Sequence, residues 1–288
     1  MARSACVHHS WRSPVRHELG APATLTGPDA EATLPAVKAV AVIPARFGST
    51  RFPGKPLARE TGKFLIQHVY EQASRAARLD GVIVATDDER IAEAVRGFGG
   101  EVRMTRADHP TGTDRIAEVA ADLDAQIIVN VQGDEPEMEP DNIDRLIGLL
   151  ADASDLSIAT LACPFSAGAD PADPNTVKVV LDQRGRAMYF SRALIPYPRD
   201  HAGRPDDSSR WLLHLGIYAY RRATLLELAK LPPTPNETRE KLEQLRFLEN
   251  GYAIAVGVVP RAAVGIDTPQ DYAAFVARYR AAASRSKS

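Results

Sequence analysis

The chain has 288 residues, of which 44% are hydrophobic and 25% are charged, as in an ordinary globular protein. Its formal net charge of −2 argues against a nucleic-acid partner, because proteins that bind nucleic acids carry a strongly basic surface. Charged or polar residues interrupt every apolar run well short of the roughly 18 residues that a membrane span needs, so no membrane partner is expected. Two cysteines, Cys6 and Cys163, are too few for a disulfide framework or a zinc site, which fits a reducing cytoplasm.

The N-terminal segment differs from the rest of the chain. Residues 1–37 are rich in Arg, His, Ser, Pro and Ala and show no apolar periodicity, so they predict a flexible extension. They also lack the apolar stretch of a secretory signal peptide. Residues 38–284 contain no linker long enough to separate independent domains, and we expect them to form a single domain.

A predicted strand and a basic loop open this domain. The apolar residues 37–43 predict a buried strand that ends at Pro44, which has no backbone N–H to donate to a neighbouring strand. Three cations follow closely, together with glycines and hydroxyl side chains that suit phosphate oxygens. The candidates for binding an anion in this loop are Arg46, Ser49, Arg51 and Lys55.

This basic loop is not a Walker A loop. That motif has four residues between its glycines and a Ser or Thr after its lysine, whereas five residues separate Gly48 from Gly54 and Pro56 follows Lys55. The alternative interpretation is a solvated basic loop without a ligand. Its place directly after the first strand favours an anion site, because α/β sheets bind ligands at the carboxyl ends of their strands.

Strands and helices alternate over the first half of the domain, as their apolar periodicity indicates. The expected elements are a helix over residues 62–79, a strand over 81–86, a helix after Asp87 and Asp88, a strand over 101–104, a helix capped at Thr111 or Thr113, and a strand over 127–131. This alternation predicts an α/β fold with a doubly wound, mostly parallel sheet.

The second half is richer in predicted strands. We expect strands over 156–162, 177–181, 187–190 and 214–220, helices over 223–230 and 237–248, a strand over 252–258, and a closing helix from Thr268. A hairpin turn at 182–185 joins the second and third of these strands. The pattern predicts a smaller antiparallel insert over about residues 155–220, packed on the main sheet.

One aspartate is a candidate metal ligand by its position. Asp134 follows the central strand at the carboxyl edge of the sheet, where a carboxylate beside cations and phosphates suits magnesium. The alternative for Asp134 is an acidic turn that caps the helix near Asp141, and position alone leaves both open. Asp267, just ahead of Pro269, is by itself typical of a helix N-cap.

Several motifs connect these residues to a known family. The segments over 44–56, 104–109, 112–115, 129–136, 189–192, 214–218, 242–246 and 265–269 occur in this order. Together they resemble the family of 3-deoxy-manno-octulosonate cytidylyltransferases, or CMP-Kdo synthetases, among the sugar nucleotidyltransferases. The resemblance implies a nucleotide-diphospho-sugar transferase-like fold, CTP and Kdo as substrates, Mg²⁺ as cofactor, CMP-Kdo for lipopolysaccharide biosynthesis as product, a cytoplasmic location and a homodimer built through the antiparallel insert.

The resemblance also implies roles for individual residues. Arg46, Ser49, Arg51 and Lys55 would hold the triphosphate, Arg106 would help to bind the nucleotide, and Asp134 and Asp267 would share magnesium. Lys55, Arg46, Arg51 and Asp134 would be the catalytic residues. The residues that would line the sugar pocket are Gln132, His214, Tyr218, Glu243 and Gln244. The chain departs from the family at Ala263, where a glycine is common.

Other interpretations of these residues remain open in the sequence. Taken singly, His214 and Tyr218 are typical of half-buried strand residues satisfied by neighbours, and Glu243 and Gln244 of an exposed helix face. A cytidylyltransferase for 8-amino-Kdo or a sialic acid would differ around the same positions. A catalytically idle nucleotide-binding protein is disfavoured by both candidate metal carboxylates, and a Rossmann dehydrogenase by the lack of a G-x-G-x-x-G motif after a strand.

Overall fold

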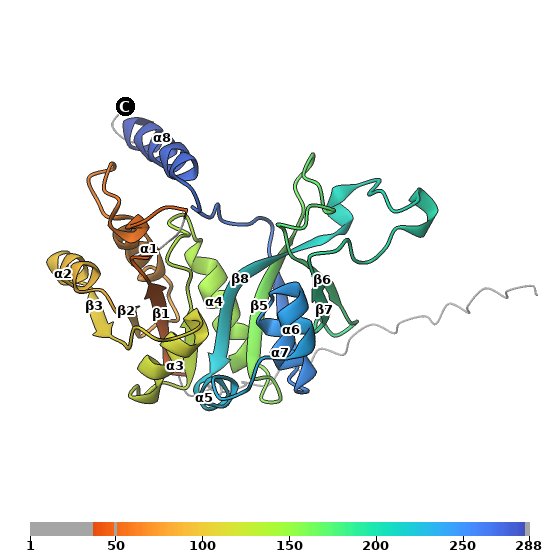
Figure 1. The fold of residues 1–288 in the computed structure, drawn as a ribbon, viewed down its shortest axis with the longest axis horizontal. Coiled ribbons are helices and arrows are strands. Elements are labelled where there is room, and N and C mark those ends of the chain that lie inside the picture. The colour runs from red at the N-terminus through yellow and green to blue at the C-terminus, as the bar shows by residue number, and fades with distance from the viewer. Residues whose placement is uncertain (1–36, 49–50, 286–288) are drawn as a thin grey trace, which may run out of the picture. The chain divides into compact units, whose positions relative to one another are not determined.

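Nine strands form one sheet in the described part of the chain, residues 37–48 and 51–285. In the computed structural model, the strands follow the order β3-β2-β1-β4-β8-β5-β9, and β6 and β7 lie off this path (Figure 1). The strands are β1 (Ala39–Ala45), β2 (Gly81–Thr86), β3 (Glu101–Met104), β4 (Ile127–Asn130), β5 (Ile158–Pro164), β6 (Lys178–Leu181), β7 (Ala187–Ser191), β8 (Leu212–Arg221) and β9 (Ile254–Val258). The described residues belong to a compact unit that begins at Val37. The predictions for residues 1–36 and for Ser49 lie outside the described ranges.

Parallel pairing dominates the first half of the sheet. Strands β3, β2, β1 and β4 are mutually parallel neighbours, with Val42 opposite Ile83 on one side and Asn130 on the other. Strand β8 is antiparallel to both β4 and β5, and β9 is parallel to β5. The carboxyl ends of β1 and β4 therefore lie side by side.

Helices cover both faces of this sheet. The helices are α1 (Leu65–Ala73), α2 (Glu89–Gly97), α3 (Gly112–Ala121), α4 (Pro140–Ala151), α5 (Arg222–Leu228), α6 (Pro235–Glu240), α7 (Gln244–Glu249) and α8 (Pro269–Arg285), with short 3₁₀ turns at Lys55–Leu57, Arg199–His201 and Ser208–Arg210. Helix α8 packs against Leu65 of α1 and not on the sheet. Because side chains alternate along a strand, Ala41 and Ile43 pack with α1, α2 and α4, and Val40 and Val42 pack with α3, α5 and α7. The predicted doubly wound α/β fold is confirmed.

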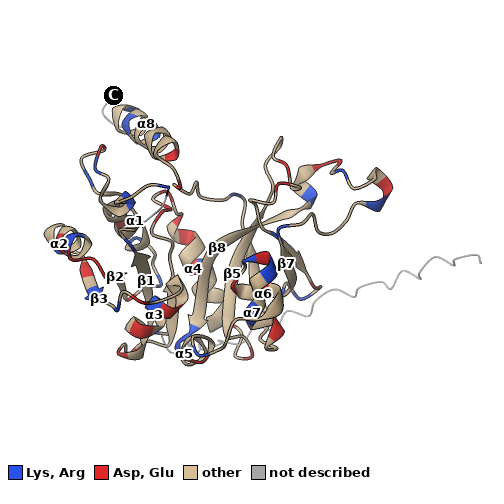
Figure 2. Ribbon diagram, in the orientation of Figure 1, with Lys and Arg blue, Asp and Glu red and all other residues tan. Residues whose placement is uncertain are grey.

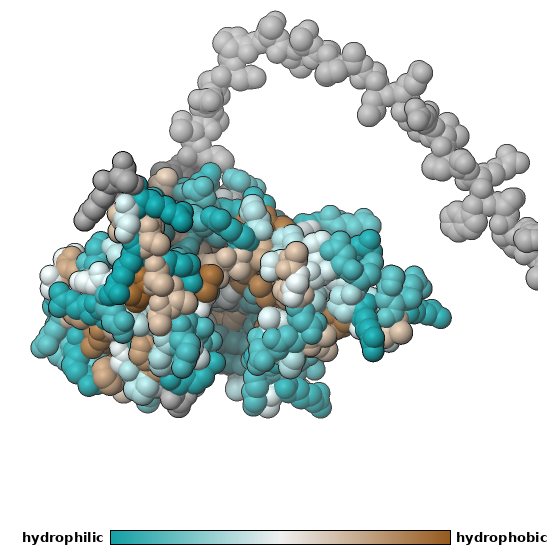
Figure 3. Space-filling model, turned by 90° about the horizontal axis from the view of Figure 1, so that it is seen from above, coloured by the Kyte–Doolittle hydropathy of each residue, from teal (hydrophilic) through white to brown (hydrophobic). Residues whose placement is uncertain are grey.

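The surface is polar and the strands are not. Charged residues gather on helices and loops and are sparse along the central strands (Figure 2). Seen from above, the molecule is hydrophilic over most of its visible face and hollowed near its middle (Figure 3). In the described part of the chain, no helix combines the length and the apolar character needed to cross a bilayer.

Two predicted boundaries were wrong. Strand β1 does not end at Pro44 but continues to Ala45, with Pro44 opposite Ala85 of β2. Pairing of β1 with β4 stops at Val42, so the proline stands where its missing N–H costs little. The single helix expected over 237–248 is broken at Lys241, which adopts a left-handed conformation with φ of 54°.

The antiparallel strands expected within about residues 155–220 are present, but they divide into two groups. Strands β5 and β8 are part of the main sheet, and β6 and β7 form a hairpin beside it (Figure 1). Its turn is the predicted one, closed by a 2.8 Å hydrogen bond from Asp182 N to Arg186 O, with Gly185 at φ of 73°. The residue pattern predicted these strands, and the structure shows which strands pair with one another.

Candidate functional site

The basic loop after β1 folds back on itself. Gly54 N donates a 3.0 Å hydrogen bond to Phe47 O, and Gly54 has φ of 70°. A side chain at this left-handed position would be strained, and its Cβ would lie 3.1 Å from the Phe47 ring. The Arg90 guanidinium packs over the Phe47 ring, 3.4 Å from its centre. The loop therefore has a defined base from which Lys55 projects.

Lys55 lies between the two candidate metal carboxylates. Its Nζ is 2.9 Å from Asp134 Oδ2 and 4.0 Å from Asp267 Oδ1, and it donates a 2.6 Å hydrogen bond to Ile266 O. The Lys55 side chain is only 12% exposed, so these charges interact more strongly than they would in water. Arg51 reaches the same place from solvent, with a guanidinium nitrogen 3.1 Å from Asp267 Oδ1. The sequence-predicted residues Arg51, Lys55, Asp134 and Asp267 are thus brought together.

Gly133 lets the loop after β4 approach β1. A Cβ at this position would lie 2.8 Å from Pro44 O, a distance that side-chain carbons do not tolerate. The other side of the loop is fixed by a 2.9 Å hydrogen bond from Ile266 N to Asp134 O. Asp134 does not cap α4, which begins several residues later behind Glu139, so the alternative interpretation of Asp134 was wrong.

Asp267 is not the cap of α8 either. Thr268 and Asp271 exchange hydrogen bonds at this helix start, 2.8 Å from Thr268 N to Asp271 Oδ2 and 3.2 Å from Asp271 N to Thr268 Oγ1. This reciprocal arrangement satisfies the first N–H groups of the helix. The Asp267 carboxylate consequently faces Arg51 and Lys55. Ala263, where the family often has glycine, packs against the core in the preceding segment.

The carboxylate pair suits magnesium better than a fully protein-made metal cage. Residues 37–48 and 51–285 contain no cluster of three or more His, Cys, Asp or Glu side chains that could hold a metal. Magnesium commonly takes one or two carboxylates and completes its shell with water and substrate phosphates. Neighbouring Glu135 adds little negative charge, because burial and the Asp134 charge raise its pKa to about 8.

A cavity of about 240 Å³ opens beside these carboxylates. Arg46 lies at its edge, and one guanidinium nitrogen donates to His109 O at 2.7 Å and to Thr111 O at 3.1 Å. The cavity is lined by Pro44, Ala45, Arg46, Gly48, Lys55, Pro56, Gly112, Gln132, Gly133 and Asp134. Arg106 is not among them, since its 69% exposed side chain points to Asp108 and Glu118 at 3.4 and 3.9 Å.

Polar side chains with unused hydrogen-bonding capacity continue from this cavity. Gln132 Nε2 donates to Gly216 O at 2.7 Å, and Thr113 Oγ1 donates to Glu243 Oε2 at 2.5 Å. The buried atoms without a hydrogen-bond partner among the described residues include Asn130 Oδ1, Tyr218 OH and Glu243 Oε1. Because a buried polar atom without a partner is costly, this group indicates a site for a polar ligand.

Burial controls the protonation of the polar side chains His214, Tyr218 and Glu243. It lowers the pKa of His214 to about 3, so the imidazole is neutral at pH 7, and its Nε2 lies 3.0 Å from Thr160 Oγ1. Burial also raises the pKa of Glu243, and burial followed by the Glu243 charge raises that of Tyr218 well above its ordinary value. Gln244 is 6% exposed. The exposed helix face expected for Glu243 and Gln244 was therefore wrong.

Comparison with known proteins fits this site. A family model described as "Cytidylyltransferase" matches residues 40–254. The chain is 54% identical over 246 residues to a 3-deoxy-manno-octulosonate cytidylyltransferase of Syntrophotalea carbinolica, covering 83% of this chain and 98% of the relative. A relative of the same name from Geobacter sulfurreducens is 54% identical over 237 residues, covering 80% and 95%. The chain belongs to the 3-deoxy-manno-octulosonate cytidylyltransferase family.

Solved structures agree with this family assignment. A CMP:2-keto-3-deoxy-manno-octonic acid synthetase complexed with CTP superposes with a TM-score of 0.78 at 46% identity, covering 83% of this chain and 97% of the other. The 4-diphosphocytidyl-2C-methyl-D-erythritol synthase of Anaerococcus prevotii, with a TM-score of 0.56 at 13% identity over 85% and 97% of the two chains, shares the fold alone.

Sequence reasoning missed three residues in or beside this candidate site. Asn130 carried a usable signal, because it is a polar residue inside an apolar, fully covered strand. Thr113 was considered only as a helix cap, a role that Thr111 takes through its bond with Asp114 N. Glu135 gave no separate signal within its acidic segment, because its altered pKa arises from burial.

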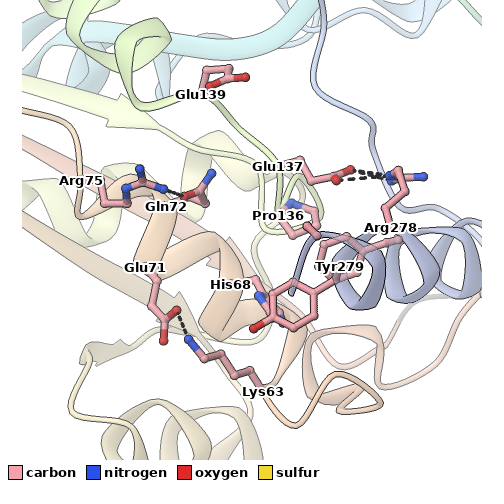
Figure 4. A pocket seen from close by; sticks show the side chains of 12 residues that line it. Lys63, His68, Glu71, Gln72, Arg75, Pro136, Glu137, Glu139, Arg278 and Tyr279 are labelled. Atoms are coloured by element: carbon pink, nitrogen blue, oxygen red, sulfur yellow. Dashed lines mark hydrogen bonds and ion pairs between the residues drawn. The ribbon is translucent and has the colours of Figure 1, made fainter. Parts of the chain in front are cut away.

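A second cavity, of about 420 Å³, lies between α1, the loop over 136–139 and α8. Four of its charged groups form two ion pairs, as the dashed lines for Lys63 with Glu71 and Arg278 with Glu137 show (Figure 4). Its base is formed by His68 and Tyr279, whose rings meet edge to face at 4.9 Å. This cavity is larger than the one beside Lys55, but none of the ion pairs among its described lining residues joins one cation to two carboxylates, as Lys55 joins Asp134 and Asp267.

Proposed function

We propose that the chain transfers CMP from CTP to 3-deoxy-D-manno-octulosonate, giving CMP-Kdo and pyrophosphate. Relatives of this name are 54% identical over most of the chain. The observation that carries the proposal is the convergence on Lys55 of Asp134 and Asp267, next to a cavity at the ends of β1 and β4. A triphosphate needs cations and a metal, and this place offers cations together with two carboxylates that could hold the metal.

In the proposed reaction the anomeric hydroxyl of Kdo attacks the α-phosphorus of CTP. A new bond forms between that oxygen and phosphorus, the bond from the α-phosphorus to the pyrophosphate oxygen breaks, and the hydroxyl proton passes to solvent water. Such phosphoryl chemistry depends on positioning and electrostatics and requires no covalent nucleophile from the protein.

The phosphate side of the site is proposed to work through charge. Asp134 and Asp267 would hold magnesium, which would offset the negative charge on the α-phosphate when bound. Lys55, Arg46 and Arg51 would bind the phosphates and stabilise the departing pyrophosphate. Ser49 is proposed as a further phosphate ligand, and Arg106 as a nucleotide contact that its exposed side chain could make by turning from Glu118.

We propose that Kdo binds to the buried polar side chains next to the cavity. Kdo carries a carboxylate and many hydroxyls, which need both donors and acceptors of hydrogen bonds. Gln132, His214, Tyr218, Glu243 and Gln244 are proposed to supply them, together with Asn130. Tyr218 OH and Glu243 Oε1 have no hydrogen-bond partner among the described residues, although an Arg246 nitrogen lies 3.8 Å from Glu243 Oε1. This supports the proposal, because a bound sugar would give both atoms a hydrogen bond.

We propose further that the chain works in the cytoplasm, where CTP is available, and as a homodimer. The dimer would form through β6, β7 and the loop that follows them. Met188 on β7 is 64% exposed and Tyr197 in that loop is 67% exposed, and exposed apolar side chains support an interface there. Light scattering during size-exclusion chromatography tests the dimer, and a monomeric mass at micromolar concentration would contradict it.

The substrate proposal is tested by pyrophosphate release. Each of the four NTPs is paired with Kdo, 8-amino-Kdo and a sialic acid, with magnesium present. We expect the highest kcat/KM for CTP with Kdo. A higher value for another acidic sugar would assign the chain to that substrate, and no release with any pair would overturn cytidylyl transfer.

A further inference from the structure

The loop between β3 and α3 holds Arg46 in place. Two carbonyls of this loop, His109 O and Thr111 O, accept hydrogen bonds from the same guanidinium nitrogen of Arg46 at 2.7 and 3.1 Å. The guanidinium is a rigid planar fork, so two fixed acceptors on one nitrogen set the direction in which the rest of the fork points. The orientation of a proposed phosphate-binding residue thus depends on where this loop lies.

Glu118 on α3 fixes the first part of that loop. Its Oε2 accepts a hydrogen bond from Arg106 N at 3.3 Å and makes a short contact with His109 Nε2. The His109 side chain is only 5% exposed, so little water competes for this contact. Burial alone would raise the pKa of Glu118, but the bonds from His109 and Arg106 N outweigh it and lower the pKa. The carboxylate is therefore ionised and well held at neutral pH.

The end of the loop is fixed to the same helix. Thr111 Oγ1 accepts from Asp114 N at 3.1 Å, and Asp114 Oδ2 accepts from Thr111 N at 3.1 Å. The carbonyl of Thr111 is thus set by the first turn of α3 and that of His109 by Glu118, which lies further along the helix. Helix α3 therefore fixes the positions of both carbonyls that hold Arg46.

We propose that Glu118 and His109 are positioning residues for Arg46. Through the carbonyl of His109 they hold the guanidinium in the orientation that binds the triphosphate of CTP, and the enzyme needs them for its affinity for CTP. The inference rests on the proposed function, because it takes Arg46 to be a phosphate ligand. Neither side chain lines the cavity beside Lys55, so their effect on catalysis passes through Arg46.

The test is a double-mutant cycle in the full-length chain. Glu118→Ala, Glu118→Gln, Arg46→Met and the double variant Glu118→Ala with Arg46→Met are assayed for kcat and for KM of CTP. Because Glu118 acts only through the orientation of Arg46, which binds the phosphates and stabilises the departing pyrophosphate, Glu118→Ala should raise KM for CTP about tenfold and lower kcat by less than Arg46→Met does. Glu118→Gln keeps an acceptor oxygen in place and should stay within about threefold of wild type.

The decisive comparison is made in the Arg46→Met background. If Glu118 acts through Arg46, adding Glu118→Ala there should change kcat/KM less than twofold, because the group it positions is gone. Asp182→Ala is the matched control. This carboxylate also accepts backbone N–H bonds, from Arg184 and Arg186 at 2.8 Å, but it lies in the β6–β7 turn and should leave KM for CTP unchanged.

Several outcomes would overturn the inference. An unchanged KM in Glu118→Ala, or a full tenfold effect that persists in the Arg46→Met background, would show that Glu118 does not act through Arg46. Should Glu118→Ala fail to fold, Glu118→Asp is measured by CTP titration calorimetry, where an unchanged Kd would contradict the proposal. A wild-type chain that neither binds nor uses CTP would instead overturn the proposed function.

Discussion

Lys55 is the residue on which the site converges. It joins a loop after β1 to a loop after β4 and to the segment before α8. Ile266, whose carbonyl accepts a hydrogen bond from Lys55 Nζ, stands 211 positions away in the chain. The ammonium group of Lys55, which is largely shielded from water, lowers the mutual repulsion of the two nearby carboxylates. In the proposed reaction Lys55 exchanges these partners for phosphate oxygens.

Replacing Lys55 tests this role directly. Lys55→Met removes the charge but keeps a similar length, so we expect kcat/KM with CTP to fall a hundredfold or more, as for the loss of one strong electrostatic contribution. Circular dichroism should show an intact fold. Lys63→Met is the control, because Lys63 pairs with Glu71 at 2.5 Å in the other cavity. A change within about twofold in Lys55→Met would exclude the loop as the triphosphate site.

His214 should make stability depend on pH. Its pKa is about 3 in the folded chain against an ordinary value of 6.5, so the unfolded chain binds more protons between these pH values. Stability is then full above about pH 6.5 and falls as the pH decreases. Between pH 7 and pH 5 wild type should lose roughly 1–2 kcal/mol more unfolding free energy than His214→Gln.

Urea denaturation of both proteins at several pH values measures this difference. Comparing the two proteins removes the contributions of other titrating groups to the pH dependence of stability, including that of His68, whose pKa is also lowered by burial. Stability curves that run parallel for wild type and His214→Gln would mean that the imidazole titrates normally in the folded chain.

Local chemistry made part of the site predictable from single residues. The cations near Lys55 and the carboxylate Asp134 were identified from type and position, because charge and phosphate chemistry need few neighbours to be recognised. Asp267 was assigned to the metal only through the family resemblance, since by itself it is typical of a helix N-cap. The inward orientation of Glu243 and Gln244 was not predictable in this way. It depends on the left-handed residue Lys241, which no glycine marks, and which ends one short helix before the next begins.

At the scale of elements, the site depends on close approach of strand ends. Gly133 brings the loop after β4 to within contact of Pro44 O. Gly133→Ala would place a Cβ 2.8 Å from that oxygen and should push Asp134 away from Lys55, lowering kcat/KM about tenfold or more. The strain should also lower unfolding free energy by roughly 1–3 kcal/mol.

Gly81→Ala provides the matched control for that change. Gly81 begins β2, and a Cβ there meets no atom within 4 Å, so activity and stability should both stay near wild type. Wild-type kinetics in Gly133→Ala would show that the close approach is not needed for the site. Initial rates and urea denaturation of both variants provide the comparison.

Most elements were predictable because apolar periodicity records which residues are covered. The pairing of the strands was not predictable, because the residue pattern of a strand shows how many of its faces are buried and not which strand lies beside it. The insertion of β8 between β4 and β5 is such a case, and it is what places Tyr218 opposite Asn130. The continuation of β1 through Pro44 was missed for the same reason, since it depends on which side of the strand has a neighbour.

At the scale of the whole molecule, residues 1–36 should be dispensable. Their sequence has no apolar periodicity with which to bury a sizeable surface, so a chain that begins at Val37 should keep wild-type turnover and a melting temperature within a few degrees. Thermal denaturation and the pyrophosphate assay measure both properties. A large loss of soluble protein or of turnover would show that this segment is structural.

The central claim is that Asp134 and Asp267, distant in the chain, form one magnesium site at which CTP and Kdo react. The measurement is initial rate against magnesium concentration, with the magnesium-dependent shift in melting temperature, for wild type, Asp134→Asn, Asp267→Asn and the double variant. Each single change should cost about a hundredfold in rate and abolish the stabilising shift. Because both act on one ion, the double variant should lose far less than the product of the single losses. Full activity of Asp267→Asn at ordinary magnesium, with an unchanged thermal shift, would contradict the claim.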